Sequence, residues 1–446
     1  MSQKTIQSTS FHKETVFPIT SRAKLYALSI DRFKTSRLSL VSVLPQTRKT
    51  AVLCPLLLSV LTQGCEGYPS FEAISCRADE LWGSLLRPQD QLWGERRVFG
   101  LSVSFIDPAY LPGNAALLGE LVDLIRRILF FPLTDETGLL PEKAVEIAKK
   151  RQCDSIRSLI SSPRRFASEH AEAFFFGDRP CGIPDYGSEE ETNAVTPAEL
   201  TAFWKDWRKT AFLSCFYVGA SDPLAVAEVL KAAFGKTAVG KAEKAPPFLV
   251  SNAPVAAAEV RRMEEPFPIE QGHLIFGFQT GGKPSFGRRQ AAMQLANELL
   301  GGAPTSLLFM NVREKLSLCY SVSSLYSPFR SALFIKCALD PDNRETAENE
   351  ILHQVDRLKK GDFTDAELES ARNSLLFAYR TISDDSDNME RAFLRRVLTP
   401  DGKTPEEMIV EIQSVTRREV LRAANLLSLE TVYFLRGTQK EGQHEI

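Results

Sequence analysis

Hydrophobic and polar positions alternate along this chain with two different periods. Alternation every second residue predicts strands, at Lys24–Ile30, Arg37–Leu44, Arg97–Ile106, His273–Thr280, Leu318–Ser324 and Ser331–Leu339. Apolar residues three and four apart predict helices between them, near Thr50–Gln63, Ser70–Trp82, Asn114–Phe131, Gly287–Leu300, Ser306–Lys315 and Asn343–Lys359. Clustered strands with flanking helices indicate an α+β fold in which the helices pack on one face of a sheet.

The same order of elements occurs twice. When the sequence is aligned with itself, Glu146 matches Glu369 and Ala148 matches Ala371. Both pairs are separated by the same number of residues (369 − 146 = 371 − 148 = 223). Each pair lies in a long helical pattern that opens with acidic residues, as the helix dipole favours. The sequence therefore predicts two homologous halves, residues 1–235 and 269–446, joined by a linker rich in Ala, Pro and Lys at 236–268.

The segment 299–322 combines a helix end, a short loop, a second helix and a strand. Gly301-Gly302 ends the first helix, and we expect a glycine there to adopt the left-handed conformation of a C-cap. Thr305 or Ser306 is a suitable N-cap for the second helix. Local chemistry explains this shape, but it does not explain why Arg313 and Tyr320 flank the turn from helix to strand.

This segment resembles the C-terminal half of the M16 (pitrilysin/insulinase-like) zinc peptidase family. In that family a helix ending in LGG, a loop of small residues, LReK and GLaYsv recur in this order. The matching pieces here are Leu300-Gly301-Gly302, Ser306-Leu307, Val312-Arg313-Glu314-Lys315 and Leu318-Cys319-Tyr320-Ser321-Val322. The resemblance implies a LuxS/M16 metallopeptidase-like fold. In that fold two α+β halves, each with a mainly antiparallel sheet and helices on one face, enclose a cavity like a clamshell.

The resemblance also locates a metal site. In the family, HxxEH on the first helix places two histidines on zinc and a glutamate beside the bound water, and a later glutamate completes the ligands. These positions fall here at Pro55, Leu58, Ser59 and Ala148, although a two-residue slip would offer Glu146 in place of Ala148. Proline and leucine have no donor atom, and neutral serine is a poor zinc ligand. The resemblance therefore implies a degenerate site with no metal in this chain and no catalytic residue.

Other candidates for metal or nucleophilic chemistry are weaker. The five histidines, His12, His170, His273, His353 and His444, are too far apart for HxxEH or HExxH. Glu169-His170-x-Glu172 can be read as a metal cluster, but side chains two apart on a helix diverge, so a charged helix face is the better interpretation. The acidic run 384–387 could attract a cation or form a loop. The chain contains no G-x-S-x-G, P-loop or Cys/His nucleophile pattern.

Composition narrows the class of protein. The chain has 446 residues, 43% hydrophobic and 25% charged, as in ordinary globular proteins, and a formal charge of −2. That charge offers no electrostatic reason to bind nucleic acid or an anionic membrane. The longest apolar run, Ala51–Leu61, is too short to span a bilayer, and no signal peptide is apparent. Eight scattered cysteines without CxxC indicate free thiols in a reducing cytoplasm.

The function follows from the resemblance. The chain resembles a bacterial subgroup of short M16 proteins that lack HxxEH and whose labels mention elongation factor P aminopentanol modification. This implies a cytoplasmic, non-catalytic subunit paired with an active M16 peptidase, which would carry the zinc. The chain would hold an unfolded peptide or small protein through Gly301, Gly302, Arg313 and Tyr320.

Two roles are open for Arg313 and Tyr320, and two other functions are open for the chain. Arginine can donate to peptide carbonyls, and tyrosine can stabilise negative charge. Alternatively, Arg313 pairs with a nearby carboxylate and Tyr320 packs under the sheet. The chain could instead be an active metallopeptidase with an atypical site, using His170 or Glu146, or a scaffold protein without a peptide role.

Overall fold

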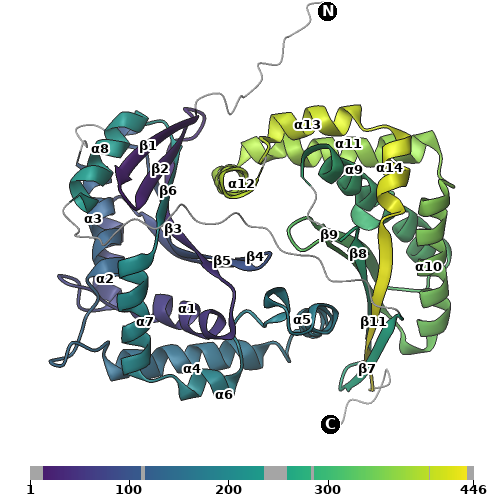
Figure 1. Ribbon diagram of the computed structural model, residues 1–446, viewed down its shortest axis with the longest axis horizontal. Helices are drawn as coiled ribbons and strands as arrows, with labels where there is room; N and C mark the ends of the chain where they lie inside the picture. The colour runs from purple at the N-terminus through teal and green to yellow at the C-terminus, as the bar shows by residue number, and fades with distance from the viewer. Residues whose placement is uncertain (1–13, 112–115, 236–258, 283–285, 401, 439–446) are drawn as a thin grey trace, which may run out of the picture.

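The protein is built from two halves that lie side by side (Figure 1). A computed structural model describes residues 14–111, 116–235, 259–282, 286–400 and 402–438. His12, His444 and residues 236–258 of the predicted linker therefore lie outside the described residues. Each half contains one sheet and its own set of helices, so the predicted α+β class is confirmed.

Six described strands of the N-terminal half form a sheet in the order β1-β2-β6-β3-β5-β4. They are β1 (Glu14–Thr20), β2 (Ala23–Ser29), β3 (Thr35–Pro45), β4 (Leu85–Trp93), β5 (Arg96–Ile106) and β6 (Leu213–Gly219). All neighbouring pairs are antiparallel except β2 and β6. The helices are α1 (Arg48–Leu61), α2 (Phe71–Glu80), α3 (Leu117–Phe130), α4 (Glu142–Ser158), α5 (Pro163–Phe176), α6 (Glu189–Ala194), α7 (Pro197–Thr210) and α8 (Pro223–Phe234).

The C-terminal sheet, among the described residues, has the order β7-β11-β8-β10-β9. Its strands are β7 (Arg261–Phe267), β8 (Gly272–Thr280), β9 (Ser321–Ser327), β10 (Ala332–Leu339) and β11 (Leu427–Gly437). Only the β7–β11 pairing is parallel in this described sheet. The α-helices are α9 (Gly287–Asn297), α10 (Arg344–Lys360), α11 (Asp365–Thr381), α12 (Ser386–Leu398), α13 (Pro405–Ser414) and α14 (Arg417–Ala424).

The two halves repeat one topology. The order β2-β6-β3-β5-β4 matches β7-β11-β8-β10-β9, and the parallel pair occupies the same place in each sheet. Helices α4 and α11 are both 17 residues long and begin 223 residues apart (365 − 142), which is the offset read from the sequence. One difference concerns the boundary. Strand β7 lies inside the range predicted as linker and is paired into the second sheet, so the C-terminal half begins before residue 269.

Besides β7, neither edge strand of the described N-terminal sheet was predicted. Strand β4 carries Pro88 and mixed polar residues, and it is an edge strand, where proline removes no ladder hydrogen bond that the sheet needs. Strand β1 is the opposite edge and is also largely exposed. Edge strands bury less of each side chain, so their apolar alternation is weak.

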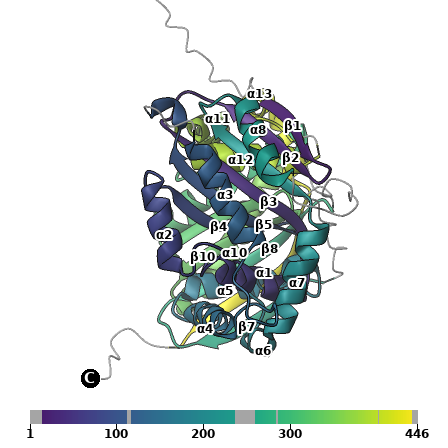
Figure 2. The same cartoon turned by 90° about the vertical axis from the view of Figure 1, so that its left-hand side faces the viewer.

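Each half buries a core between its sheet and its own helices. Figure 2 shows α1, α3 and α7 in front of the N-terminal sheet. The apolar face of α3 supplies Leu121, Val122 and Ile125, which are fully buried with strand residues Leu101 and Val103 in one cluster. A second cluster joins α9, α10 and α11 to β8 and β10.

The opposite face of each sheet is covered by a helix from the other half. Helix α5 lies on the C-terminal sheet, where Phe175 packs edge-on against Phe334 with ring centroids 5.1 Å apart. Helix α12 lies on the N-terminal sheet, where Phe393 packs edge-on against Phe216 at 5.6 Å. Figure 1 shows both helices between the halves. Burying one such phenylalanine contributes about 1.5–3 kcal/mol, so this exchange ties the halves together.

Polar bonds cross between the halves beside these aromatic contacts. The Arg37 Nε of β3 donates to Glu390 Oε2 of α12 at 2.8 Å, and Ser39 donates to the other oxygen of Glu390. On the second sheet, Glu172 of α5 accepts from Arg330 and Lys336. Within the described chain, no helix is both long and apolar enough to cross a membrane.

Candidate functional site

The first helix carries three of the four degenerate metal positions. Helix α1 begins at a capping box in which Thr47 and Thr50 bond each other's backbone. Pro55 lies inside this helix and is partly exposed, Leu58 is 2% exposed in the core, and Ser59 is partly exposed. A proline inside a helix removes a backbone hydrogen bond, so this helix keeps its place through packing of its apolar face.

The fourth degenerate position, Ala148, lies on α4, which runs antiparallel to α1. The Gln152 side chain donates to the Val52 carbonyl at 3.3 Å near one end of the pair. The Gln63 side chain donates to the Ala144 carbonyl at 3.1 Å near the other end. Ala148 lies between these two bonds and is buried, so the structure places it across from the middle of α1. The structure thus places α4 beside the part of α1 where the aligned positions are occupied by proline, leucine and serine.

Metal ligation elsewhere finds no support in the described residues, which contain no group of three or more His, Cys, Asp or Glu arranged to hold an ion. Glu146 points to solvent and pairs with Lys149 at 2.8 Å. The His170 Nδ1 lies 3.0 Å from Glu265 of β7, whereas Glu172 pairs with Arg330 and with Lys336 of β10, away from β7 in the same sheet. Side chains at 170 and 172 therefore diverge, as their helical spacing predicts. Zinc does not fit the residues present.

The other two described histidines and the acidic run have structural settings. His273 lies in β8, and burial lowers its pKa, with Arg164 adding to this effect. His353 lies on α10. The acidic run forms a short turn and the start of α12, where Asp385 caps the helix by accepting from the Asn388 N–H.

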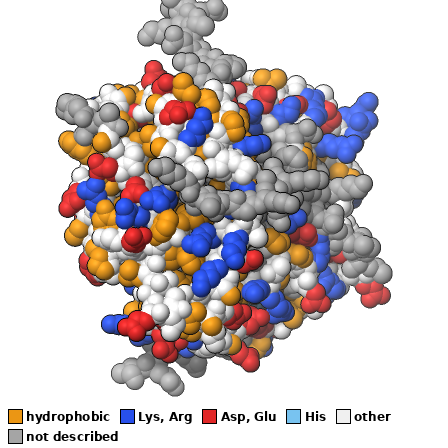
Figure 3. All heavy atoms as spheres, turned by 60° about the vertical axis from the view of Figure 1, so that its left-hand side comes forward, with side chains coloured by type: hydrophobic (Ala, Val, Ile, Leu, Met, Phe, Trp, Pro, Cys, Tyr) orange, Lys and Arg blue, Asp and Glu red, His pale blue; other side chains and the backbone are white. Residues whose placement is uncertain are grey.

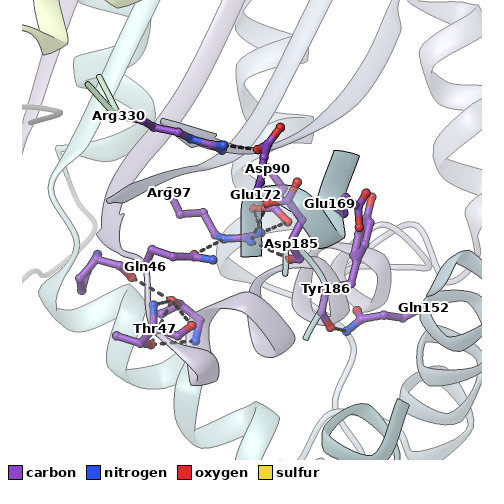
Figure 4. Close-up of polar contacts among 12 residues, drawn as sticks. Gln46, Thr47, Asp90, Arg97, Gln152, Glu169, Glu172, Asp185, Tyr186 and Arg330 are labelled. Atoms are coloured by element: carbon purple, nitrogen blue, oxygen red, sulfur yellow. Dashed lines mark hydrogen bonds and ion pairs between the residues drawn. The ribbon is translucent and has the colours of Figure 1, made fainter. Parts of the chain in front are cut away.

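A buried polar cluster lies beside the N-terminal end of α1 (Figure 4). Arg97 of β5 donates to Gln46 at 3.0 Å, to both carboxylate oxygens of Asp90 at 2.6 Å and to the Asp185 carbonyl at 2.7 Å. Burial raises the pKa of Asp90 to about 6, and the Arg97 charge opposes this rise. Burial also raises the pKa of Cys54 on α1, and the Asp90 charge adds to the rise. The cluster therefore fixes the loop before α6 onto β5, beside the start of α1.

Sequence reasoning missed this cluster because its members are far apart in the chain. Gln152 extends it by donating to the Tyr186 carbonyl at 3.0 Å. Figure 4 also draws Glu169 and the Glu172–Arg330 pair, which connects this region to the C-terminal half. Burial raises the pKa of Glu169, and the nearby charge of Asp185 adds to it. Arg97 is buried and its described hydrogen bonds all go to Gln46, Asp90 and Asp185, so it organises the segments that carry them.

Arg313 and Tyr320 meet in a second, open site. Both line a hollow of about 520 Å³ on the C-terminal half, together with Glu314, Ser317, Leu318, Cys319, Asp340 and Asn343. The Arg313 guanidinium lies 4.7 Å above the ring of Phe309, and its side chain is 42% exposed. Tyr320 is 50% exposed, and its N–H donates to the Ala338 carbonyl at 2.8 Å. The structure therefore brings these two predicted residues together on accessible surface.

The alternative roles of these two residues are partly resolved. Tyr320 does not pack under the sheet, because half of its surface is exposed. Arg313 lies 3.7 Å from Glu314, a distance at the limit of an ion pair between two exposed side chains. Such pairs contribute about 0–1 kcal/mol, so Arg313 can exchange this partner for a ligand.

Gly301 and Gly302 have a different role from the predicted one. Neither has a positive φ, so the expected left-handed C-cap is wrong. The chain instead widens into a π-helical turn, η3 (Glu298–Gly302), which ends where the Ala303 N–H bonds the Glu298 carbonyl. A Cβ at Gly301 would lie 2.8 Å from Leu308 and from the backbone nitrogen of Ser324. Close packing against β9 therefore requires glycine at 301, and neither glycine lines the hollow.

The predicted second helix is also π-helical over η4 (Phe309–Lys315). It begins at Ser306, whose hydroxyl accepts from the Phe309 N–H at 3.4 Å, as the N-cap prediction expected. Its last turn bonds the Leu318 N–H to the Val312 carbonyl. Wide turns of this kind are rare and are frequent at functional sites, and this one carries Arg313.

Comparison with known proteins agrees with this geometry. Residues 194–375 match the family described as Peptidase M16 inactive domain. The chain is 24% identical over 418 residues to a Bacillus subtilis protein named "Probable inactive metalloprotease YmfF", covering 93% of this chain and 96% of the relative.

Solved structures show the same fold over nearly the whole chain. A conserved protein from Enterococcus faecalis superposes with a TM-score of 0.85 and 23% identity, over 96% of this chain and 99% of that one. A peptidase M16 inactive domain from Pseudomonas fluorescens superposes with a TM-score of 0.75 and 17% identity, over the same shares. The chain thus has an M16-like two-domain fold, matches the M16 inactive domain over residues 194–375, and is similar to a probable inactive metalloprotease.

Proposed function

We propose that this chain is a catalytically inactive M16-family protein that binds extended peptides and acts as the non-catalytic subunit beside a separate, zinc-carrying M16 peptidase. In this proposal the chain works in the cytoplasm, needs no metal of its own, and has neither nucleic acid nor membrane as a partner. The face in Figure 3 supports the last point, because Lys and Arg side chains are interspersed there with Asp and Glu. The proposed bacterial subgroup, associated with elongation factor P modification, rests on sequence resemblance.

One observation carries the proposal. Arg313 and Tyr320 are accessible and line one hollow, whereas the positions on α1 that align with the two histidines and the glutamate of HxxEH carry Pro55, Ser59 and Leu58. Groups suited to holding a peptide are thus presented, and groups suited to activating water are replaced. That combination favours binding without hydrolysis.

The chemistry of the hollow suits a peptide backbone. Arg313 can donate to a peptide carbonyl with a charge-assisted hydrogen bond, and Tyr320 can donate or accept at the next peptide unit. Strand β9 begins at Ser321 and is the edge of its described sheet, so its outer backbone groups can pair with an added strand. A bound peptide would then run along β9 with its backbone near both side chains.

A binding measurement tests the peptide role. We expect the double variant R313A/Y320F to bind a fluorescein-labelled, unstructured peptide about tenfold more weakly than the unmodified chain, as measured by fluorescence anisotropy, since two hydrogen bonds are lost. The matched control is R418A/Y110F, which alters an exposed arginine and an exposed tyrosine outside the hollow. Equal affinity of both variants, with unchanged circular dichroism, would favour a scaffold role.

Zinc content and cleavage test the inactive state. We expect the purified chain to contain no stoichiometric zinc by mass spectrometry and to leave the same peptide intact after incubation alone. Purification from the native organism should recover a second M16 chain that cuts the peptide. Chelator-sensitive cleavage by this chain alone would show an active metallopeptidase with an atypical site and would reject the proposal.

A further inference from the structure

A small cleft with basic side chains lies next to the hollow of the C-terminal half. It is formed between helix α5 and the C-terminal sheet, and its volume is about 20 Å³. Its polar lining comes from four elements: Arg164 and Ser168 of α5, His273 of β8, Ser321 of β9 and Lys336 of β10. Among the described residues, no acidic side chain lines this cleft. The cleft therefore presents positive charge beside strand β9.

The packing of α5 on the sheet fixes the shape of the cleft. Arg164, Ser168 and Glu172 follow one another at intervals of four residues, so they share one face of the helix. Glu172 Oε1 lies 3.4 Å from the Lys336 Nζ of β10, which holds this face over that strand. Arg164 and Ser168 are therefore held above the same end of the sheet as Ser321.

The basic groups of the cleft can still bind an acid. The Arg164 guanidinium makes no hydrogen bond or ion pair with any residue that the structure describes. Lys336 shares Glu172 with Arg330, so Glu172 remains paired if Lys336 turns toward another carboxylate. Burial and the charge of Arg164 lower the pKa of His273, so its imidazole is neutral at neutral pH and can donate one N–H. Positive charge thus exceeds negative charge at this site.

The size of the cleft suits a carboxylate. A space of about 10–15 Å³ holds one water molecule, so this cleft admits a group with one or two polar atoms. An arginine can donate two parallel hydrogen bonds to a carboxylate, and a lysine adds a further charged donor. An amide of the same shape as a carboxylate carries no charge and would gain less from these donors. The chemistry therefore selects an acidic group.

Strand β9 brings the cleft within reach of a bound peptide. Tyr320 lines the hollow and Ser321 lines the cleft, so two consecutive residues connect the two sites. Both are fixed against β10, because the Tyr320 N–H bonds the Ala338 carbonyl and Ser321 pairs with Ala338. A residue opposite Ser321 on an added strand would have its Cβ about 4.5–5.5 Å away and its side chain on the same face of the sheet. Serine is small, so a longer side chain can pass it and enter the cleft.

We propose that the cleft of Arg164, His273 and Lys336 binds the side-chain carboxylate of a glutamate in a peptide that extends β9, so that the chain prefers acidic peptides. This inference rests on the proposed peptide-binding function and names the class of peptide that the chain takes. Strand β9 and the hollow hold the peptide backbone, and the cleft supplies the preference for sequence. Glutamate suits the site better than aspartate, because its side chain has one more methylene group with which to pass Ser321.

The test compares two labelled, unstructured peptides that carry either one glutamate or one glutamine at the centre. Both are acetylated and amidated at their ends, so the side chain supplies the only difference in charge. We expect the full-length chain to bind the glutamate peptide about tenfold more tightly in fluorescence anisotropy at low salt, because hydrogen bonds to charged groups are the stronger ones. Higher salt should reduce this difference. A glutamine peptide with a free C-terminus should bind no more tightly than its amidated form.

Two variants locate the effect. R164Q removes a charge that has no described partner, and it should lower the preference for glutamate from about tenfold to about threefold. The matched control is R165Q, which removes the same charge one residue further along α5. Arg165 does not line the cleft, its side chain is exposed, and its Nη2 lies 3.5 Å from Glu169. R165Q should keep the tenfold preference, and both variants should keep the circular dichroism of the unmodified chain.

The possible outcomes separate this inference from the proposed function. Equal binding of the glutamate and glutamine peptides would overturn the inference and leave the proposed function standing. An equal loss of preference in R164Q and R165Q would also overturn it, because the effect would then depend on general charge. A glutamine peptide with a free C-terminus that binds as tightly as the glutamate peptide would assign the cleft to a terminal carboxylate and reject the glutamate. Binding of neither peptide would reject the proposed function and this inference with it.

Discussion

The buried ion pair between Arg37 and Glu390 should control how firmly α12 holds the two halves together. Both side chains are almost fully buried, at 6% and 4% exposure, and they come from different halves. Replacing Glu390 with alanine removes one charge-assisted bond from Arg37 and one hydrogen bond from Ser39. The perturbation therefore leaves a buried guanidinium with fewer acceptors.

The structure sets the size of the effect. Breaking a buried pair by removing one partner costs about 3–5 kcal/mol. Asp387 still pairs with Arg37 and is partly exposed, so we expect the lower end, about 3 kcal/mol. Replacing both partners, as in R37M/E390L, should cost less than E390A alone, because no buried charge is left unpaired.

Hydrogen exchange of the α12 backbone measures this directly, since it reports local opening and needs no two-state unfolding. A loss of about 3 kcal/mol predicts exchange about a hundredfold faster in E390A. The control is D384N, which removes the exposed pair of Asp384 with Arg32 and should change exchange by less than about fivefold. Equal exchange of α12 in E390A and D384N would refute the reasoning.

Three further predictions concern packing, pH and the positions that align with a zinc site. The variant G301A should lower the free energy of unfolding by about 1–3 kcal/mol, because its new Cβ meets Leu308 and Ser324. The control G119A has no atom within 4 Å of its new Cβ, so it should be neutral or stabilising in the same thermal melts. Burial raises the pKa of Asp90 from 3.8 to about 6, so between these pH values the folded chain keeps a proton that the unfolded chain loses. The contribution of Asp90 to the free energy of unfolding is therefore complete below pH 4. It should fall by at most roughly 3 kcal/mol as the pH rises through 6. Urea unfolding at pH 4 and pH 7 should show this loss in the unmodified chain and not in D90N, and equal pH dependence in both would contradict it. The variant P55H/L58E/S59H/A148E places zinc donors at the aligned positions and should bind zinc, as measured by metal analysis after dialysis. A folded variant without zinc would show that the aligned positions do not form a site.

Much of the fold could be predicted because the hydrophobic pattern along the sequence matches the helices and strands that the fold buries. The amphipathic pattern of α4 and its copy α11 recurs with a constant offset, and both helices have the same length in the structure. Strand β6 is buried along its whole length and is strongly apolar. Edge strands β1 and β4 escaped prediction because half-exposed positions lack strict alternation.

The candidate site was predictable only in part. Arg313 and Tyr320 lie in one short segment, so their motif identified them, and the fold then placed both at one hollow. The role expected for Gly301 was wrong, since a glycine can serve either a left-handed turn or close packing, and only the position of β9 shows which. The Arg97 cluster was invisible because Gln46 and Asp185 come from segments far in the chain from the Asp90–Arg97 pair.

The sequence by itself determined the duplication, the order of elements and the residue types, Pro55, Leu58 and Ser59, at the positions of the first helix that align with a zinc site. These properties depend on residue type and spacing along the chain. Only the tertiary structure decided which half each helix covers: α5 and α12 are copies of one element, and each packs on the sheet of the opposite half. A helix face carries no information about which of two similar apolar surfaces it will bury, so that choice depends on how the whole chain packs.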